Sequence, residues 1–279
     1  MCTSLHYQNC MGRNFDYEIS YKEACRIHDK EKYKIIGMVT DIIQEYPLYY
    51  DAMNECGLCI AGLNFEGNAY YNKYKKENKN NIAPWELPVK VLGNCRNVME
   101  AKRYLEDVWI YDKNFNEQMP NSSLHWMICD KNFCITVEPM KDGLKIYNNE
   151  VGVLTNNPPF PAQLKAYRRS KKVKSLYKKL YKKLLKKEYS TRGTETLGVA
   201  GDLTSMSRFE RACYYKDKMI SKGKQASETF HLLDLVKQPY GATPVGDKFE
   251  YTIYEVVYDM KKGSMQVKNY DNEVYERRL

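Results

Sequence analysis

Two stretches at the start of the chain decide the fold: MCTSLHY at residues 1–7 and GRNFD at residues 12–16. Short runs with apolar and aromatic residues, bounded by polar turn residues, are typical of β-strands. We therefore predict strands over residues 2–7 and 12–20, joined by a tight connection at residues 9–10. Such a hairpin brings the cation and the carboxylate of the second stretch close to the start of the chain.

Cys2 is the first residue that indicates chemistry. An initiator Met is normally removed when a small residue follows it, which leaves a thiol and a free α-amine on one residue. The reference pKa values are about 8.5 for a thiol and about 7.7–8.0 for an α-amine, so the amine can accept the thiol proton near neutral pH. A guanidinium such as Arg13 favours a thiolate, and a carboxylate such as Asp16 can orient the terminal ammonium. From these residues alone, a small residue at position 2 and an ordinary surface ion pair are the commoner interpretations.

The rest of the chain keeps strand patterns and helix patterns in separate blocks. Residues 51–57 read as a polar turn that leads into an apolar strand at residues 58–63. Separate blocks of strands and helices favour an α+β layered fold, and no linker or repeat divides residues 1–279, so we expect a single domain. The other predicted strands cover residues 124–129, 133–138, 144–147, 151–155, 250–259 and 264–270, and the predicted helices cover residues 84–92, 98–108, 207–220 and 227–236.

Eight motifs, ordered along nearly the whole chain, resemble the signatures of the choloylglycine hydrolase family, which comprises bile salt hydrolases and penicillin V acylases. The motifs are MCT (1–3), GRNFD (12–16), DAMNECGL (51–58), AGLNF (61–65), LHWM (124–127), DGL (142–144), GVLTNNP (152–158) and GDLTSMSRF (201–209). The resemblance implies the N-terminal nucleophile hydrolase fold, a four-layer αββα sandwich. This fold agrees with the separate strand and helix blocks.

Carried over position by position, the resemblance implies a thiol amidase without metal or organic cofactor. Attack on an amide carbonyl would release an amine and leave a thioester acyl-enzyme, which water then hydrolyses. Neutral amide donors suit the negative charge that builds on the carbonyl oxygen. The implied roles are nucleophile and base for Cys2 and its amine, thiol and amine partners for Arg13 and Asp16, oxyanion hole for Asn64 and Asn156, and completion of the charged cluster for Arg208.

Two intervals are shorter than is usual in the family. Ten residues separate Cys2 from Arg13, and the interval between Ser20 and Gly37 is also short. Loops usually shape a substrate pocket, so these differences bear on the choice of substrate rather than on hydrolysis. Asn64 resembles the bile salt hydrolase version of its motif, which favours conjugated bile salts over penicillin V or another N-acyl amide, including acyl-homoserine lactones. Phe15, Tyr17, Ile19, Tyr21 and Phe65 could form an apolar substrate wall or belong to the core.

Composition places the chain among globular proteins. Of the 279 residues, 28% are charged and 43% are hydrophobic, and no apolar run approaches the roughly 18 residues of a membrane helix. The N-terminus lacks a secretory signal pattern, so we expect a cytoplasmic protein. Nine scattered cysteines do not fit a secreted disulfide scaffold. Cys56 and Cys59 have CxxC spacing, but without a matching second pair we expect small buried residues rather than a zinc or redox site.

A basic segment at residues 168–187 holds eleven Lys and Arg residues and no acidic residue, against a net charge of +9 for the chain. Leucines and tyrosines at helical spacing predict a narrow apolar stripe on a cationic helix. In the resembled family this region packs against neighbouring subunits, so we expect an assembly contact in a homo-oligomer, a tetramer by resemblance. Binding to an anionic membrane or to nucleic acid by a protein with a vestigial site is the alternative from another class, and steering of anionic substrates is a third.

Overall fold

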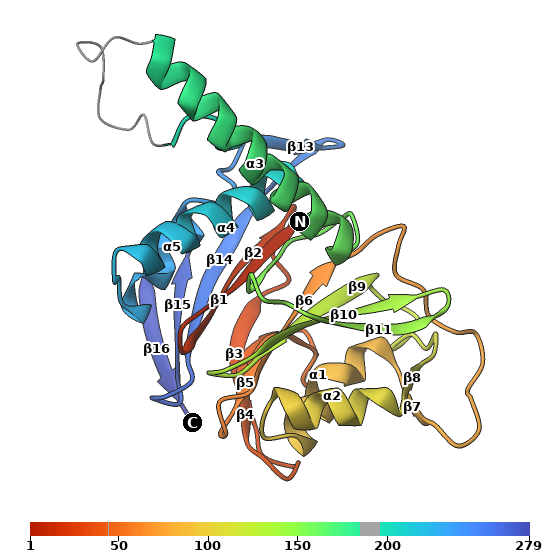
Figure 1. Cartoon of the computed structure of the whole chain (residues 1–279). Coiled ribbons are helices and arrows are strands. Elements are labelled where there is room, and N and C mark those ends of the chain that lie inside the picture. Colours follow the sequence, from red (N-terminus) through yellow and green to blue (C-terminus); the bar gives the residue numbers. More distant parts are fainter. Residues whose placement is uncertain (44, 185–195) are drawn as a thin grey trace.

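The computed structural model describes residues 1–43, 45–184 and 196–279, with the side chains of residues 177–178 and 181–184 also left undescribed. Its two large sheets each have seven strands and lie face to face (Figure 1). Residues 185–187, the end of the predicted basic helix, lie outside the described residues. The sequence therefore folds around a sheet-on-sheet core, as expected from its strand blocks.

The first sheet contains the N-terminal hairpin. Cys2 lies opposite Phe15, and Ser4 lies opposite Arg13, which confirms the predicted pairing of the two stretches. The turn between the strands passes through Gln8 in a left-handed conformation. The strand order is β12 (Val153–Leu154), β1 (Cys2–Tyr7), β2 (Cys10–Tyr17), β14 (Lys248–Asp259), β15 (Ser264–Asn269) and β16 (Val274–Arg278), with β13 (Thr243–Val245) paired to β14.

The second sheet is a continuous antiparallel array that includes the three strands predicted within residues 124–147, which follow one another as a meander. Its order is β11 (Gly143–Asn148), β10 (Cys134–Met140), β9 (Leu124–Cys129), β6 (Cys59–Asn64), β5 (Tyr49–Asn54), β4 (Ile35–Thr40) and β3 (Glu23–His28). A separate parallel pair is formed by β7 (Asn80–Ile82) and β8 (Val108–Ile110).

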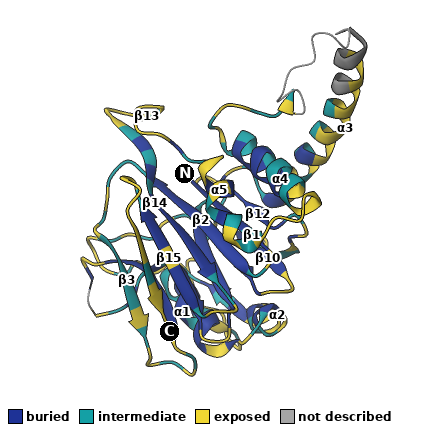
Figure 2. Cartoon of the chain, turned by 90° about the vertical axis from the view of Figure 1, so that its left-hand side faces the viewer, coloured by how far each residue is buried: buried dark blue, intermediate teal, exposed yellow. Residues whose placement is uncertain are grey.

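Helices cover the outer face of each sheet and complete the αββα sandwich that the family resemblance implied. A 3-10 turn at Pro84–Glu86 leads into α1 (Leu87–Asn94), which packs with α2 (Val98–Glu106) on the second sheet through one apolar cluster. On the first sheet lie α4 (Ser205–Ser221) and α5 (Thr229–Asp234), the latter after a 3-10 turn at Ala226–Glu228. Figure 2 shows the strands between these layers as mostly buried.

The helix α3 (Phe160–Leu184) begins against the body of the protein and then extends beyond α4 (Figure 1). It includes most of the predicted basic segment and starts eight residues before it. Lys174 pairs with Glu210 of α4, and Lys171 with Asp217 of α4 at 3.1 Å. Among the described residues, no helix combines the length and the apolar character needed to cross a lipid bilayer.

Several sequence predictions need correction. The first turn lies at residues 8–9, because Cys10 already belongs to β2, and β2 ends at Tyr17 rather than at residue 20. Cys56 is exposed and not buried as expected. Residues 51–54 are not part of a turn but the end of β5, and only residues 55–57 turn the chain into β6. The polar residues Asp51 and Asn54 suggested a turn because they read as solvent-exposed, yet both are fully buried and hydrogen-bonded. The prediction of two C-terminal strands, over residues 250–259 and 264–270, is also incomplete, because β16 adds a third strand against β15.

Gly37 allows β4 and β5 to approach each other. It lies opposite Ala52, and a Cβ atom added at Gly37 would collide with the carbonyl oxygen of Asp51 and lie 2.5 Å from Cβ of Ala52. These atoms belong to the backbone of β5 or are bonded directly to it, so they cannot move without displacing the strand. The position of Asp51 in the interior thus depends on the missing side chain at Gly37.

We expect Gly37→Ala to lower the free energy of unfolding by about 1–3 kcal/mol, because overpacking forces backbone shifts. Urea denaturation followed by circular dichroism measures this loss. Gly201→Ala is the matched control, since nothing lies within 4 Å of a Cβ added there. Equal stabilities of the two variants would contradict the packing argument.

Candidate active site

The alternation of side chains along β2 sends its two charged residues to opposite faces of the first sheet. Arg13 points between the sheets and donates from Nη1 to Asp51 of β5 at 2.5 Å. Asn14 points the other way, towards the helix layer, and donates to the carbonyl of Leu233. Asp16 shares the face of Asn14. Arg13 and Asp16 therefore act on different sides of the chain start.

The Cys2 thiol lies between the sheets beside Arg13. Its Sγ atom is 3.4 Å from Arg13 Nη2, and Cys2 is only 3% exposed. The same nitrogen donates to the carbonyl of Gly62 on β6 at 2.7 Å. Burial tends to lower the pKa of Arg13, but the neighbouring Cys2, Tyr254 and Asp51 outweigh it and raise that pKa above its usual value. Arg13 is thus a fixed cation held against the thiol.

Asp51 anchors this cation, and sequence reasoning assigned it no role. Its carboxylate accepts from Arg13, from the Tyr254 hydroxyl at 2.6 Å and from the Tyr258 hydroxyl at 2.5 Å. Burial, followed by the charge of Asp51, holds the pKa of both tyrosines well above the usual range, so they remain donors. Two features of the sequence could have indicated this role of Asp51. It lies within a signature motif, and the two tyrosines have the i, i+4 spacing that puts them on one face of a strand.

The backbone of Cys2 is held by Asn156 and Arg208. The nitrogen of Cys2 donates to Asn156 Oδ1 at 2.9 Å, and its carbonyl accepts from Arg208 Nη1 at 2.7 Å. Arg208 also donates to Asn156 Oδ1 at 2.8 Å, and Asn156 Nδ2 donates to the carbonyl of Asn64 at 2.9 Å. Burial lowers the pKa of Arg208, with Asp16 and Cys2 acting against that shift. The structure therefore places Asn156 and Arg208 against Cys2, and it places the main-chain carbonyl of Asn64 against Asn156.

The carboxylate of Asp16 lies behind the chain start, whereas its main-chain carbonyl accepts from the Cys2 thiol at 3.9 Å. Its carboxylate accepts from the Thr252 hydroxyl at 2.6 Å and from Gln238 Nε2 at 2.9 Å, and it lies 3.8 Å from Arg208. The main-chain carbonyl of Asp16 accepts from the Met1 ammonium at 3.1 Å. That ammonium also forms an ion pair with Glu250. With Met1 in place, the nitrogen of Cys2 is a peptide N–H and not an amine.

Two of the residues expected in a substrate wall belong to the core. Phe65 is fully buried and stacks on the ring of His125, so its ring cannot line an open pocket. Phe15 is 5% exposed and stacks on Tyr254 at 5.0 Å, which makes it part of the packing around Arg13. Tyr17, the last residue of β2, and Ile19, two residues beyond it, are partly exposed. These two keep the accessibility that a substrate contact needs.

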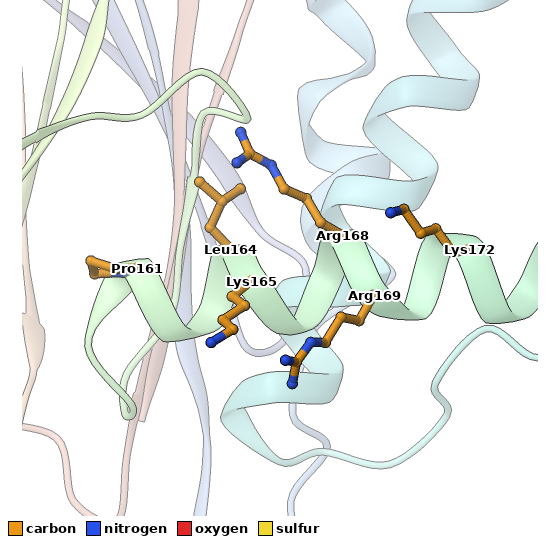
Figure 3. A pocket seen from close by; sticks show the side chains of 6 residues that line it. All are labelled: Pro161, Leu164, Lys165, Arg168, Arg169 and Lys172. Atoms are coloured by element: carbon orange, nitrogen blue, oxygen red, sulfur yellow. The ribbon is translucent and has the colours of Figure 1, made fainter.

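A shallow groove of about 350 Å³ lies along α3 and not at Cys2 (Figure 3). Four cationic side chains line it together with Pro161 and Leu164. None of the groups that contact Cys2 is among its lining residues. The groove is a feature of the basic helix, separate from the cluster around the thiol. The cationic lining residues are Lys165, Arg168, Arg169 and Lys172.

Comparison with known proteins assigns the family. Residues 2–277 match the family described as linear amide C–N hydrolases, choloylglycine hydrolase family. The chain belongs to the choloylglycine hydrolase family. It is therefore a hydrolase of linear amide C–N bonds, which confirms the enzyme prediction over the alternative of a basic binding protein.

Relatives in this family extend over nearly the whole chain. A protein from Lactiplantibacillus plantarum named bile salt hydrolase/transferase is 44% identical over 98% of this chain and 90% of its own length. The crystal structure of a mutant conjugated bile acid hydrolase from Clostridium perfringens superposes with a TM-score of 0.89 at 30% identity, covering 100% of this chain and 92% of the other. A penicillin V acylase from Agrobacterium tumefaciens, 18% identical, covers 100% of this chain and 86% of its own with a TM-score of 0.74 and so shares the fold.

We expect Asp51→Asn to destabilise the protein by about 3–5 kcal/mol, because it leaves the Arg13 charge buried without its carboxylate. Urea denaturation of both proteins measures the difference. The control is Asp107→Asn, which breaks a 3.1 Å pair with Lys79 at the surface, where ion pairs contribute little. A stability loss no larger than that of the control would contradict the anchoring role of Asp51.

Proposed function

We propose that this hydrolase cleaves linear amides with Cys2 as nucleophile, and that its substrates are glycine- and taurine-conjugated bile salts. The observation that carries the mechanism is the buried Arg13 guanidinium 3.4 Å from the Cys2 thiol. A fixed cation favours the thiolate, which is the nucleophilic form. The 44% identity to a bile salt hydrolase/transferase supports the substrate class.

The proposed base is the α-amine of Cys2, which requires removal of Met1. The nitrogen of Cys2 already bonds to Asn156 Oδ1, and this bond is compatible with an amine at the same atom. The buried carboxylate of Asp16 and the guanidinium of Arg208 lie behind it and fix its surroundings. Nucleophile and base would then be held on one residue by contacts present before the substrate arrives.

The reaction follows from these positions. The amine takes the thiol proton, the sulfur attacks the amide carbon, and the oxygen gains negative charge. An amide nitrogen carries two hydrogens, and Asn156 uses one of them for the carbonyl of Asn64, so the other is the proposed oxyanion donor together with Asn64. The amine returns the proton to the leaving nitrogen as the C–N bond breaks. Water then hydrolyses the thioester and releases the carboxylic acid and the thiol.

Intact mass and a hydrolysis panel test this proposal together. We expect the purified protein to lack one methionine residue and to hydrolyse glycine- and taurine-conjugated cholate faster than penicillin V or acyl-homoserine lactones. Cys2→Ala should lower kcat by at least about 10³-fold, because the nucleophile is lost. Turnover that survives in Cys2→Ala would contradict the nucleophile, and retention of Met1 in an active protein would contradict the base. Faster hydrolysis of penicillin V or of an acyl-homoserine lactone would contradict the proposal that bile salts are the substrates.

We also propose that the exposed side of α3 is a contact between copies of this chain in a homo-oligomer, with a tetramer expected from the family resemblance. Val173, Leu176 and Leu180 are 66%, 70% and 54% exposed and lie on one side of the helix. Burying them against another subunit removes apolar surface from water. The single-domain organisation of residues 1–279 and the cytoplasmic location stay predictions.

Replacing Leu176 and Leu180 together by Glu should reduce the molar mass of the particle measured by light scattering after size-exclusion chromatography. The physical reason is that two buried carboxylates would oppose the apolar contact. Phe133→Glu is the control, since Phe133 is 53% exposed in the turn between β9 and β10. An unchanged mass for the double variant would show that α3 does not hold copies together.

A further inference from the structure

His125 lies at the centre of a buried cluster that the proposed reaction leaves without a role. It belongs to β9, is fully buried, and forms a contact with each of its ring nitrogens. It is also part of the LHWM motif at residues 124–127. A histidine removed from solvent in this way cannot touch a substrate. The role of His125 must therefore follow from the groups that it contacts inside the protein.

The ring joins the two segments that carry the asparagines around Cys2. Its Nε2 atom lies 2.7 Å from the carbonyl oxygen of Thr155, the residue before Asn156. Its face stacks on Phe65, the residue after Asn64, with 4.2 Å between ring centroids and 8° between planes. The edge of the His125 ring thus holds the segment of Thr155 and Asn156, and the face of the ring holds the segment of Asn64 and Phe65.

Glu138 prevents the ring from turning. A carbonyl oxygen only accepts, so the nitrogen facing Thr155 carries a hydrogen. The other nitrogen, Nδ1, lies 3.2 Å from Glu138 Oε1, and a proton must lie between these two atoms because otherwise two lone pairs would face each other. The same carboxylate oxygen accepts from the backbone nitrogen of Phe160 at 2.8 Å, at the first residue of α3. His125 is therefore oriented by a group that is itself held by a helix N-terminus.

We propose that His125 is a positioning residue that sets the distance between Asn64 and Asn156, and through them the geometry of the oxyanion hole. This inference rests on the oxyanion role given to both asparagines in the proposed function. The bond from Asn156 Nδ2 to the carbonyl of Asn64, at 2.9 Å, is the contact whose length His125 controls. A displacement of about 1 Å at such a site is enough to lower the rate of reaction 100-fold.

The test separates positioning of the oxyanion donors from folding and from the reactivity of the thiol. His125→Phe keeps a ring against Phe65 but removes both polar contacts, and Phe65→Leu keeps the polar contacts but removes the stack. We expect kcat for the best bile salt substrate to fall about 10- to 100-fold in His125→Phe and less in Phe65→Leu. KM should change little. The rate of Cys2 alkylation by iodoacetamide should stay as in wild type, because Arg13 is untouched.

Trp126→Phe is the matched control, since Trp126 is also fully buried but packs on the opposite face of β9, in the apolar cluster with α1 and α2. It should leave kcat unchanged whatever it does to the melting temperature. If His125→Phe does not fold, Phe65→Leu decides the question by the same readouts. An unchanged kcat per reactive thiol, or thiol alkylation that falls in parallel with kcat, would overturn the inference. A wild-type protein without turnover would instead overturn the proposed function itself.

Discussion

The contact on which the rest of the site depends is the ion pair between Arg13 and Asp51. It crosses from one sheet to the other, and both side chains are removed from solvent. A buried guanidinium is costly unless its charge and most of its donors are matched. Asp51, the carbonyl of Gly62 and the Cys2 thiol match the charge of Arg13 and its two Nη atoms. Its Nε atom has no hydrogen-bond partner among the described residues. The same ion pair therefore joins the two sheets and places a cation beside the thiol.

The other side of the first sheet carries a second charged group with a different task. Arg208 enters from α4 and meets Asp16, Asn156 and the carbonyl of Cys2. These contacts act on the backbone of the first residues, whereas Arg13 acts on the side chain of Cys2. The thiol and the nitrogen of one residue are thus controlled from opposite faces of a strand. Separate contacts to the thiol and to the backbone nitrogen suit a residue that is proposed to supply both nucleophile and base.

Much of the fold follows from local pattern, and the exceptions share a physical cause. The first hairpin, the meander of residues 124–147 and the helices over residues 87–94, 98–106 and 205–221 agree with the predicted elements. Residues 51–54 were wrongly predicted as part of a turn, because polar residues such as Asp51 and Asn54 look exposed in a sequence until their buried hydrogen-bond partners are known. Phe65 looked like a pocket wall for the converse reason, since an aromatic residue near a functional motif is equally suited to core packing.

The sequence by itself determined the family through its motifs, and the family resemblance implied the αββα layers and most of the residues that lie around Cys2. Local periodicity alone gave only separate blocks of strands and helices. Only the tertiary structure decided which partners those residues meet. Asp51, Tyr254 and Tyr258 converge from strands that are distant in the chain, and His125 comes to lie between Thr155 and Phe65. Such meetings depend on how two sheets and their helices pack. No pattern along the chain specifies the distance between side chains on different layers.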